Sequence, residues 1–276
     1  MSEFADLPED QATGRIAEIY GEIRQYGAVP YVSSLQRQLA TVPGCLEWLW
    51  EAARPAFLDG RVPEAAWAAV AGLDLPHLAP IPKPALRTLG VDARSEAQLH
   101  GIFETFLRAS PVNMVTASLL GHLLDSPSST SPPTPQVAAR WTPPAPPPPL
   151  PGFPTDEELG PDARELLSLF RVDMHGARFV PGLYRLLAHW PAYLAHVAVD
   201  LIPLFEREDI KRTCYDVVAR IDQIVPALVS GISAPPPPFD AATRDALRGS
   251  LAVYRGTTSP QMIVFSTMLR DALPSE

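Results

Sequence analysis

Asp173 and His175 are separated by one residue, in a segment that precedes Phe179 and an apolar stretch. A carboxylate beside an imidazole can orient the ring, so that the imidazole acts as a general base. No nucleophile is evident near the pair, and an ordinary solvated loop accounts for the same residues. We therefore keep Asp173 and His175 as candidate catalytic residues, with the solvated loop as the alternative.

A second pair, His196 and Asp200, is spaced by four residues, which places both side chains on one face of a helix. This spacing can hold a metal ion, but no third ligand follows nearby, so we favour a hydrogen-bonded surface pair and expect no metal. The sequence also lacks a phosphate-binding glycine loop, a GxSxG elbow, a CxxC pair and an HExxH motif. No motif of the sequence thus identifies a catalytic site directly, and the helices that would position a site have to be considered next.

An internal repeat organises the chain, because residues 13–125 and 160–273 follow one pattern at an offset of 148 to 149. The segment Leu39-Ala40-x-x-Pro43 recurs as Leu187-Ala188-x-x-Pro191, and Ser110-Pro111 recurs as Ser259-Pro260. A repeat of this length indicates two domain-sized copies, which would pair about a pseudo-twofold axis. A ligand site is then expected at the seam, where the copies are free to differ.

The repeat predicts three segments, with residues 1–126 as the first helical repeat and residues 160–276 as the second. Residues 127–159 are rich in proline, which disfavours regular helix and favours an extended, semi-rigid spacer. We interpret them as the linker between the copies. Docking of this linker on another protein is the alternative.

The rest of the chain is helical in its periodicity. Apolar residues recur at intervals of three and four, as in Ile16, Ile19, Tyr20 and Ile23, and no convincing strand alternation occurs. Each Ser-Pro pair of the repeat is expected to begin a helix, with serine as the cap and proline at the first helical position. The sequence predicts an all-α fold with about six helices in each copy.

Composition excludes several classes of partner. The net charge of −9 and a pI near 5.2 argue against a nucleic-acid-binding protein, and no apolar run is long enough to cross a membrane. The two cysteines suit reduced thiols, and the amino-terminal residues show no signal peptide, so we expect a cytoplasmic protein. A homodimer remains possible.

Several short motifs resemble those of the group I haloacid dehalogenases, which process D- and L-2-haloacids. They are Ile19-Tyr20-x-x-Ile23-Arg24, Val29-Pro30-Tyr31-Val32, Leu39-Ala40-Thr41-Val42-Pro43-Gly44, Pro82-Lys83-Pro84-x-Leu86 and Leu187-Ala188-His189-Trp190-Pro191. The resemblance spans nearly the whole chain. It implies an all-helical pseudo-dimer around a central pocket, in which an aspartate activates water to displace halide without a cofactor or metal.

The same resemblance assigns site residues to this sequence. Tyr31 matches the family's pocket aromatic, and Tyr254 matches a pocket tyrosine late in the second copy. At the position of the family's catalytic aspartate this chain has Leu183, and at the position of its asparagine it has Ser110. Leucine cannot accept a proton, so the resemblance implies a scaffold without the usual water-activating group.

Asn113 completes the predicted site. It is a polar residue in an apolar stretch, and its counterpart in the second copy is Met262, an asymmetry that a site at the seam would produce. The sequence thus predicts an apolar central pocket for a small or medium organic ligand, with these substrate-binding residues: Tyr31, Ser110, Asn113, Leu183 and Tyr254.

Three readings of function remain open. The first is an enzyme or ligand-binding protein that does not perform the known halide displacement. The second is a non-catalytic small-molecule-binding protein on the same scaffold. The third is a cofactor-independent dehalogenase of 2-halocarboxylic acids whose base has moved, with Asp173 and His175 as its candidates.

Overall fold

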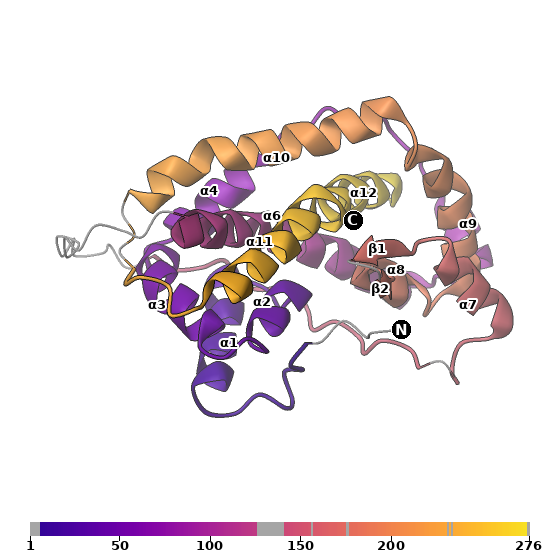
Figure 1. Ribbon diagram of the computed structural model, residues 1–276. Coiled ribbons are helices and arrows are strands. Elements are labelled where there is room, and N and C mark those ends of the chain that lie inside the picture. Colours follow the sequence, from indigo (N-terminus) through magenta and orange to yellow (C-terminus); the bar gives the residue numbers. More distant parts are fainter. Residues whose placement is uncertain are drawn as a thin grey trace.

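The computed structural model describes residues 6–125, 141–155, 157–174, 177–230, 232 and 234–274. The predicted all-α fold is confirmed (Figure 1). The first part of the chain forms α1 (Gly14–Gly27), α2 (Ser34–Leu39), α3 (Cys45–Leu58), α4 (Arg61–Ala69), α5 (Lys83–Thr88) and α6 (Ala93–Asp125).

The second part of the chain contains further helices and one small hairpin. These elements are α7 (Pro161–Ser168), β1 (Val172–Met174), β2 (Ala177–Phe179), α8 (Gly182–Leu187), α9 (Pro191–Leu201), the 3-10 helix η1 (Ile202–Leu204), α10 (Glu208–Val229), α11 (Ala241–Gly256) and α12 (Thr258–Ala272). The hairpin is an addition to the predicted helices, in which β1 and β2 pair antiparallel with Val172 opposite Phe179. Strands of three residues are too short to show an alternating pattern in the sequence.

Helix α6 is the centre of the molecule (Figure 1). It packs against α1, α4, α8, α10, α11 and α12, and its buried residues continue from Leu99 to Leu124. A helix this long with contacts on several sides is held by tertiary packing more than by intrinsic propensity. It therefore connects the amino-terminal helices with the carboxyl-terminal ones.

The Ser-Pro pairs of the repeat behave differently in the two halves. We expected a helix to begin at Ser110-Pro111, but both residues lie buried inside α6, which continues through them. Proline inside a helix removes a hydrogen bond at a cost of about 3 kcal/mol, which the burial of α6 on both sides of Pro111 offsets. In the second half the chain does break, because Thr257 separates α11 from α12 just before Ser259-Pro260.

The two halves share one continuous set of buried apolar side chains. Polar contacts also join them: the Ile81 amide donates to the Ala272 carbonyl at 2.8 Å, and Trp48 Nε1 donates to the Pro235 carbonyl at 3.0 Å. The predicted domain boundaries remain predictions. None of the described helices is long and apolar enough to cross a membrane.

The described part of the proline-rich segment lies against the helices. Trp141 contacts Trp67, with ring centroids 6.4 Å apart, and its Nε1 donates to Glu64 at 2.7 Å. Farther along, Arg108 of α6 donates to the Ala145 carbonyl at 2.6 Å. The linker is thus packed on the first half over these residues, which positions its next residues beside the cavity described below.

Candidate functional site

A cavity of about 100 Å³ lies where elements from both halves of the chain meet. We call it the seam cavity. Its walls come from the start of α2, the middle of α6, the linker, the start of α8 and the junction of α11 with α12. The lining residues are Tyr31, Ser33, Ser34, Arg37, Phe106, Ser110, Asn113, Leu150, Phe153, Phe179, Pro181, Gly182, Arg185, Leu186, Tyr254, Thr258, Ser259 and Met262.

Several of these residues occupy corresponding places in the sequence repeat. Arg37 and Arg185 are 148 residues apart, and Ser110 and Ser259 are 149 apart, which matches the repeat offset. Both arginines lie on the short helix that follows an extended entry segment, α2 in the first half and α8 in the second. The site thus draws on the same local structure twice.

The two arginines differ in their surroundings. Arg37 forms an ion pair with Asp6 at 2.6 Å, while the guanidinium of Arg185 lies 4.0 Å from the ring centre of Phe153. Within the described residues, neither Asp, Glu nor His lines the cavity. The charged side chains of the lining are therefore cationic, and the wall offers no carboxylate or imidazole to accept a proton.

Two tyrosines contribute phenol groups to the lining. Burial raises the pKa of Tyr31 well above its usual value, and the nearby Tyr254 raises it further. Burial also raises the pKa of Tyr254, against an opposing effect of the hydroxyls of Ser33, Ser259 and Ser34. Both phenols are consequently protonated at neutral pH, so they act as hydrogen-bond donors and not as bases.

Serine hydroxyls make up most of the remaining polar wall. Ser259 is 3% exposed, and its hydroxyl lies beside the phenol of Tyr254, whose pKa it lowers. The lining is mostly apolar, as expected, and it also contains a set of hydroxyls and guanidinium groups.

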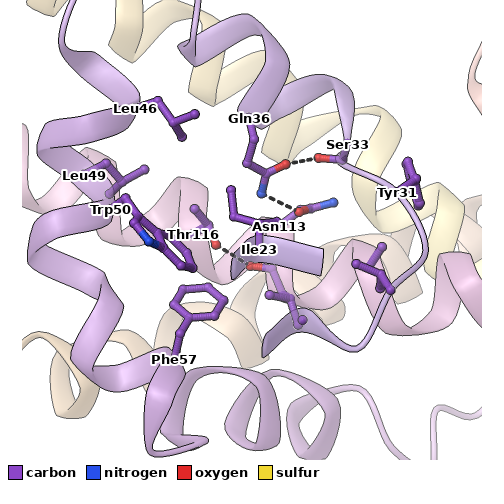
Figure 2. Close-up of a pocket in the computed structure, with 14 residues that line it drawn as sticks. Ile23, Tyr31, Ser33, Gln36, Leu46, Leu49, Trp50, Phe57, Asn113 and Thr116 are labelled. Atoms are coloured by element: carbon purple, nitrogen blue, oxygen red, sulfur yellow. Dashed lines mark hydrogen bonds between the residues drawn. The ribbon is translucent and has the colours of Figure 1, made fainter. Parts of the chain in front are cut away.

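Asn113 belongs to a buried hydrogen-bonded chain (Figure 2). Its Oδ1 accepts from Gln36 Nε2 at 2.7 Å, and the Ser33 hydroxyl donates to Gln36 Oε1. Ser33, Asn113 and Tyr31 also line a smaller cavity of about 20 Å³, together with Gln36, Thr116 and a larger number of apolar side chains. The amide oxygen of Asn113 is thus hydrogen-bonded within the protein, which helps to explain how a polar residue is buried in helix α6.

The structure brings together four of the five predicted binding residues, since Tyr31, Ser110, Asn113 and Tyr254 all line the seam cavity. Leu183 is a correction: it is fully buried in the core and lines neither this cavity nor the smaller one. Helical geometry gives the reason. Positions 182, 185 and 186 of α8 share one face, toward the cavity, while Leu183 points about 100° away from Gly182.

Asp173, the described member of the candidate catalytic pair, does not line the seam cavity. It lies exposed on β1, and its register partner in the hairpin is Arg178. His175 lies outside the described residues, so the predicted pair has no described geometry.

The other candidate pair remains a surface pair. His196 Nε2 lies 3.5 Å from Asp200 Oδ2, with side chains 37% and 33% exposed. Across the described ranges, no group of three or more His, Cys, Asp or Glu side chains is arranged to hold a metal ion. This geometry fits the hydrogen-bonded pair that the sequence favoured.

Sequence reasoning missed the two arginines and the linker residue Phe153. A usable signal existed, because Arg37 and Arg185 recur at the repeat offset three residues after the start of corresponding helices. Phe153 lies in the linker, where sequence pattern alone assigns no contact. Its place against Arg185 depends on how the linker folds back.

No model of a known protein family matches this sequence, and no curated protein matches it either. Solved structures do resemble it. A D-2-haloacid dehalogenase mutant in complex with D-2-CPA superposes with a TM-score of 0.75 at 17% identity, over 98% of this chain and 96% of the other. A D-2-haloacid dehalogenase with L-LA has the same TM-score at 16% identity, over 98% and 96%.

A further mutant of D-2-haloacid dehalogenase also has a TM-score of 0.75, at 16% identity over 97% of this chain and 95% of the other. Since these likenesses cover nearly the full length of both chains, the protein has the all-α scaffold of a D-2-haloacid dehalogenase. At this level of identity they establish the fold, while the chemistry has to be argued from the site itself.

Proposed function

We propose that this protein binds a small organic acid in the seam cavity and does not displace halide from 2-haloacids by carboxylate-activated water. The observation that carries the proposal is the composition of the wall. Arg37 and Arg185 line it together with hydroxyl groups, and no carboxylate or imidazole of the described chain does. The two halves are proposed to pair as repeats around this cavity, in an intramolecular pseudo-dimer.

The size of the cavity limits the ligand. An apolar cavity of about 150 Å³ holds benzene, so the seam cavity, at about 100 Å³, suits a molecule smaller than benzene. Short carboxylic acids with one further substituent are in this range. The structural neighbours support the same class, since one was solved with D-2-CPA and another with L-LA.

The polar groups of the wall suit an anion. Guanidinium groups bind carboxylates through strong charge-assisted hydrogen bonds, and protonated phenols and hydroxyls add neutral donors. Arg185, Tyr254 and Ser259 supply these three kinds of donor in one cavity. The aromatic residues Phe106 and Phe153 would cover the apolar part of the ligand.

The proposed loss of halide displacement follows from proton chemistry. A water molecule must lose a proton to attack carbon, and a positioned general base typically contributes about 10²- to 10⁴-fold to such a step. The phenols of Tyr31 and Tyr254 cannot take this role, because burial raises the pKa of each. Any reaction that the protein catalyses in this cavity would therefore be of another type.

The test is to incubate the protein with each enantiomer of 2-chloropropionate, measuring binding by native mass spectrometry and free chloride with an ion-selective electrode. We expect a complex with the acid and no chloride above that of a heat-denatured sample. Chloride release in proportion to enzyme would overturn the proposal. It would favour the third reading, a relocated base, which Asp173→Asn and His175→Ala variants would then locate.

A binding protein and an enzyme of unknown reaction differ in what happens to the bound acid. Recovery of unchanged ligand after long incubation would support the non-catalytic reading, and a new mass in the recovered ligand would indicate catalysis. We propose a cytoplasmic protein that uses no cofactor or metal. A homodimer is kept as a prediction, which light scattering would measure.

A further inference from the structure

A second hollow, of about 200 Å³, lies next to the seam cavity and is rich in arginine. We call it the outer hollow. Three guanidinium groups and one hydroxyl line it, and its described wall contains no Asp or Glu. Its lining residues are Pro154, Leu159, Arg164, Leu167, Ser168, Arg171, Val180 and Arg185.

The outer hollow and the seam cavity share a thin partition. Arg185 lines both. On the linker, Phe153 lines the seam cavity and its neighbour Pro154 lines the outer hollow. At the end of β2 successive residues also line different cavities. Phe179 and Pro181 line the seam cavity, and Val180 between them lines the outer hollow.

We propose that the outer hollow is an anion-binding entrance site, from which a small carboxylate passes Arg185 and Phe153 into the seam cavity. This inference rests on the proposed function for its destination, but the outer site itself is defined independently. Arg171 belongs to the outer hollow alone, whereas Arg185 contacts the carboxylate at both ends of the passage.

Electrostatics supports this route. The chain as a whole carries a net charge of −9, which repels an anion, whereas the three guanidinium groups that line the outer hollow attract one locally. Clefts lined with charge of one sign raise the local concentration of the opposite charge and its association rate. The effect on the rate should weaken as salt is added, because exposed charges are screened over about 10 Å at 0.1 M.

The side chains of the partition are suited to move. Phe153 is 39% exposed, and Arg185 is held over its ring by a cation–π contact at 4.0 Å, which contributes about 0.5–1 kcal/mol at an exposed site. The Phe153 ring also lies beside Gly182, where a Cβ would be 3.4 Å from Phe153 Cζ, an ordinary van der Waals distance. The Phe153 ring with Arg185 above it therefore forms a closure that a small anion can displace.

The test compares 2-chloropropionate with its uncharged amide, using NMR line shapes to obtain association and dissociation rates. Arg171→Ala removes one charge from the outer hollow and leaves the seam cavity intact. Arg87→Ala, on the exposed surface of α5, removes one charge elsewhere and is the matched control. We expect the first variant to lower the association rate of the acid several-fold at low salt, with the amide and the control unchanged.

Equal association rates in both variants would overturn the proposal, and so would an equal loss for acid and amide.

Phe153→Ala is expected to speed both association and dissociation of the acid, and unchanged rates would contradict the closure. Backbone amide shifts during a titration with propionate separate the two proposals. Shifts at Ser168 and Arg171 alone would support the outer site and refute seam binding, while shifts at the seam alone would refute the outer site.

Discussion

Gly182 and Leu183 are chain neighbours with different surroundings, and this difference decides which position could carry a catalytic group. Gly182 lines the seam cavity, while Leu183 is fully buried among core residues. A carboxylate is therefore compatible with the fold at the first position and not at the second. The resemblance placed the family aspartate at Leu183, which does not line this cavity, whereas its chain neighbour Gly182 does.

We predict that Leu183→Asp loses about 4 kcal/mol or more of stability, because it removes a buried leucine and buries an unpaired charge. Gly182→Asp should cost less than about 1 kcal/mol, since a side chain there meets only ordinary contacts and an acidic residue is favourable in the first turn of a helix. Urea denaturation followed by circular dichroism measures both values.

Gly182→Asp should also weaken the binding of 2-chloropropionate and leave its amide unaffected, because the new carboxylate repels the anion. A Gly182→Asn variant is the uncharged control for size. Equal losses in the two variants would show that space, and not charge, controls this position.

Buried thiol and phenol groups make the free energy of unfolding depend on pH in the alkaline range. Burial raises the pKa of Cys45 and of Tyr20 to about 12, and that of Cys214 to about 11. In the unfolded chain, thiols and phenols lose their protons near pH 8.5 and about 10, so the unfolded state is favoured as pH rises above these values.

We therefore expect the free energy of unfolding to be constant from about pH 7 to 8 with respect to these groups, and to fall from about pH 9 to 11. Each buried group can contribute up to about 1.4 kcal/mol per pH unit over this range. Urea midpoints at each pH provide the measurement. A midpoint that does not move up to pH 11 would show that these groups are accessible in the folded protein.

Among the elements, the linker shows how a proline-rich segment acquires a fixed place. Trp141 packs over Gly60, where a Cβ would lie 2.5 Å from the indole ring. Gly60 has a φ of 83°, which glycine adopts without strain, and it precedes α4. Docking of Trp141 is therefore possible because residue 60 has no side chain.

We predict that Gly60→Ala destabilises the protein by about 2–3 kcal/mol, from backbone strain together with lost packing of Trp141. Gly90→Ala is the matched control, since its φ of 81° imposes a similar strain with no atom within 4 Å of the new Cβ. It should cost about 1 kcal/mol.

Thermal unfolding measures both substitutions. In a Trp141→Ala background the two glycine substitutions should cost the same, because the clash at residue 60 is gone. An undiminished difference between them would contradict the role assigned to the indole.

At the scale of the whole molecule, the two halves are not independent in their packing. Helix α6 of the first half packs on α10, α11 and α12 of the second, and the Ile81 amide is bound by the carbonyl of Ala272. A unit of about 115 residues has the size of an ordinary domain, but the buried apolar side chains of these halves form one shared set, so each half alone would expose part of its core.

We predict that residues 1–130 and 131–276, produced as separate chains, do not unfold cooperatively when alone and regain the native circular dichroism spectrum on mixing. Gel filtration and thermal melts of each half and of the mixture are the measurements. A cooperative melt of an isolated half would show that it is a self-sufficient domain.

The all-α class followed from local chemistry, because apolar spacing of three and four residues is a property of the chain itself. Tyr31, Ser110, Asn113 and Tyr254 were predicted from sequence and resemblance as binding residues, and all four line one cavity. Their role in binding stays a prediction. The hairpin at β1 and β2 and the continuation of α6 through Pro111 were not foreseen. The strands of the hairpin are too short to show a pattern, and the continuation of α6 depends on its burial against distant helices.

What the amino-acid sequence determined by itself was the helical class and the residues of each helix that are apolar. Only the tertiary structure decided which face of α8 meets the cavity, so that Arg185 lines it and Leu183 does not. It also brought Phe153 of the linker against Arg185. The physical reason is that helical periodicity fixes which residues share a face, while the packing partner of that face is set by chain segments far away in sequence.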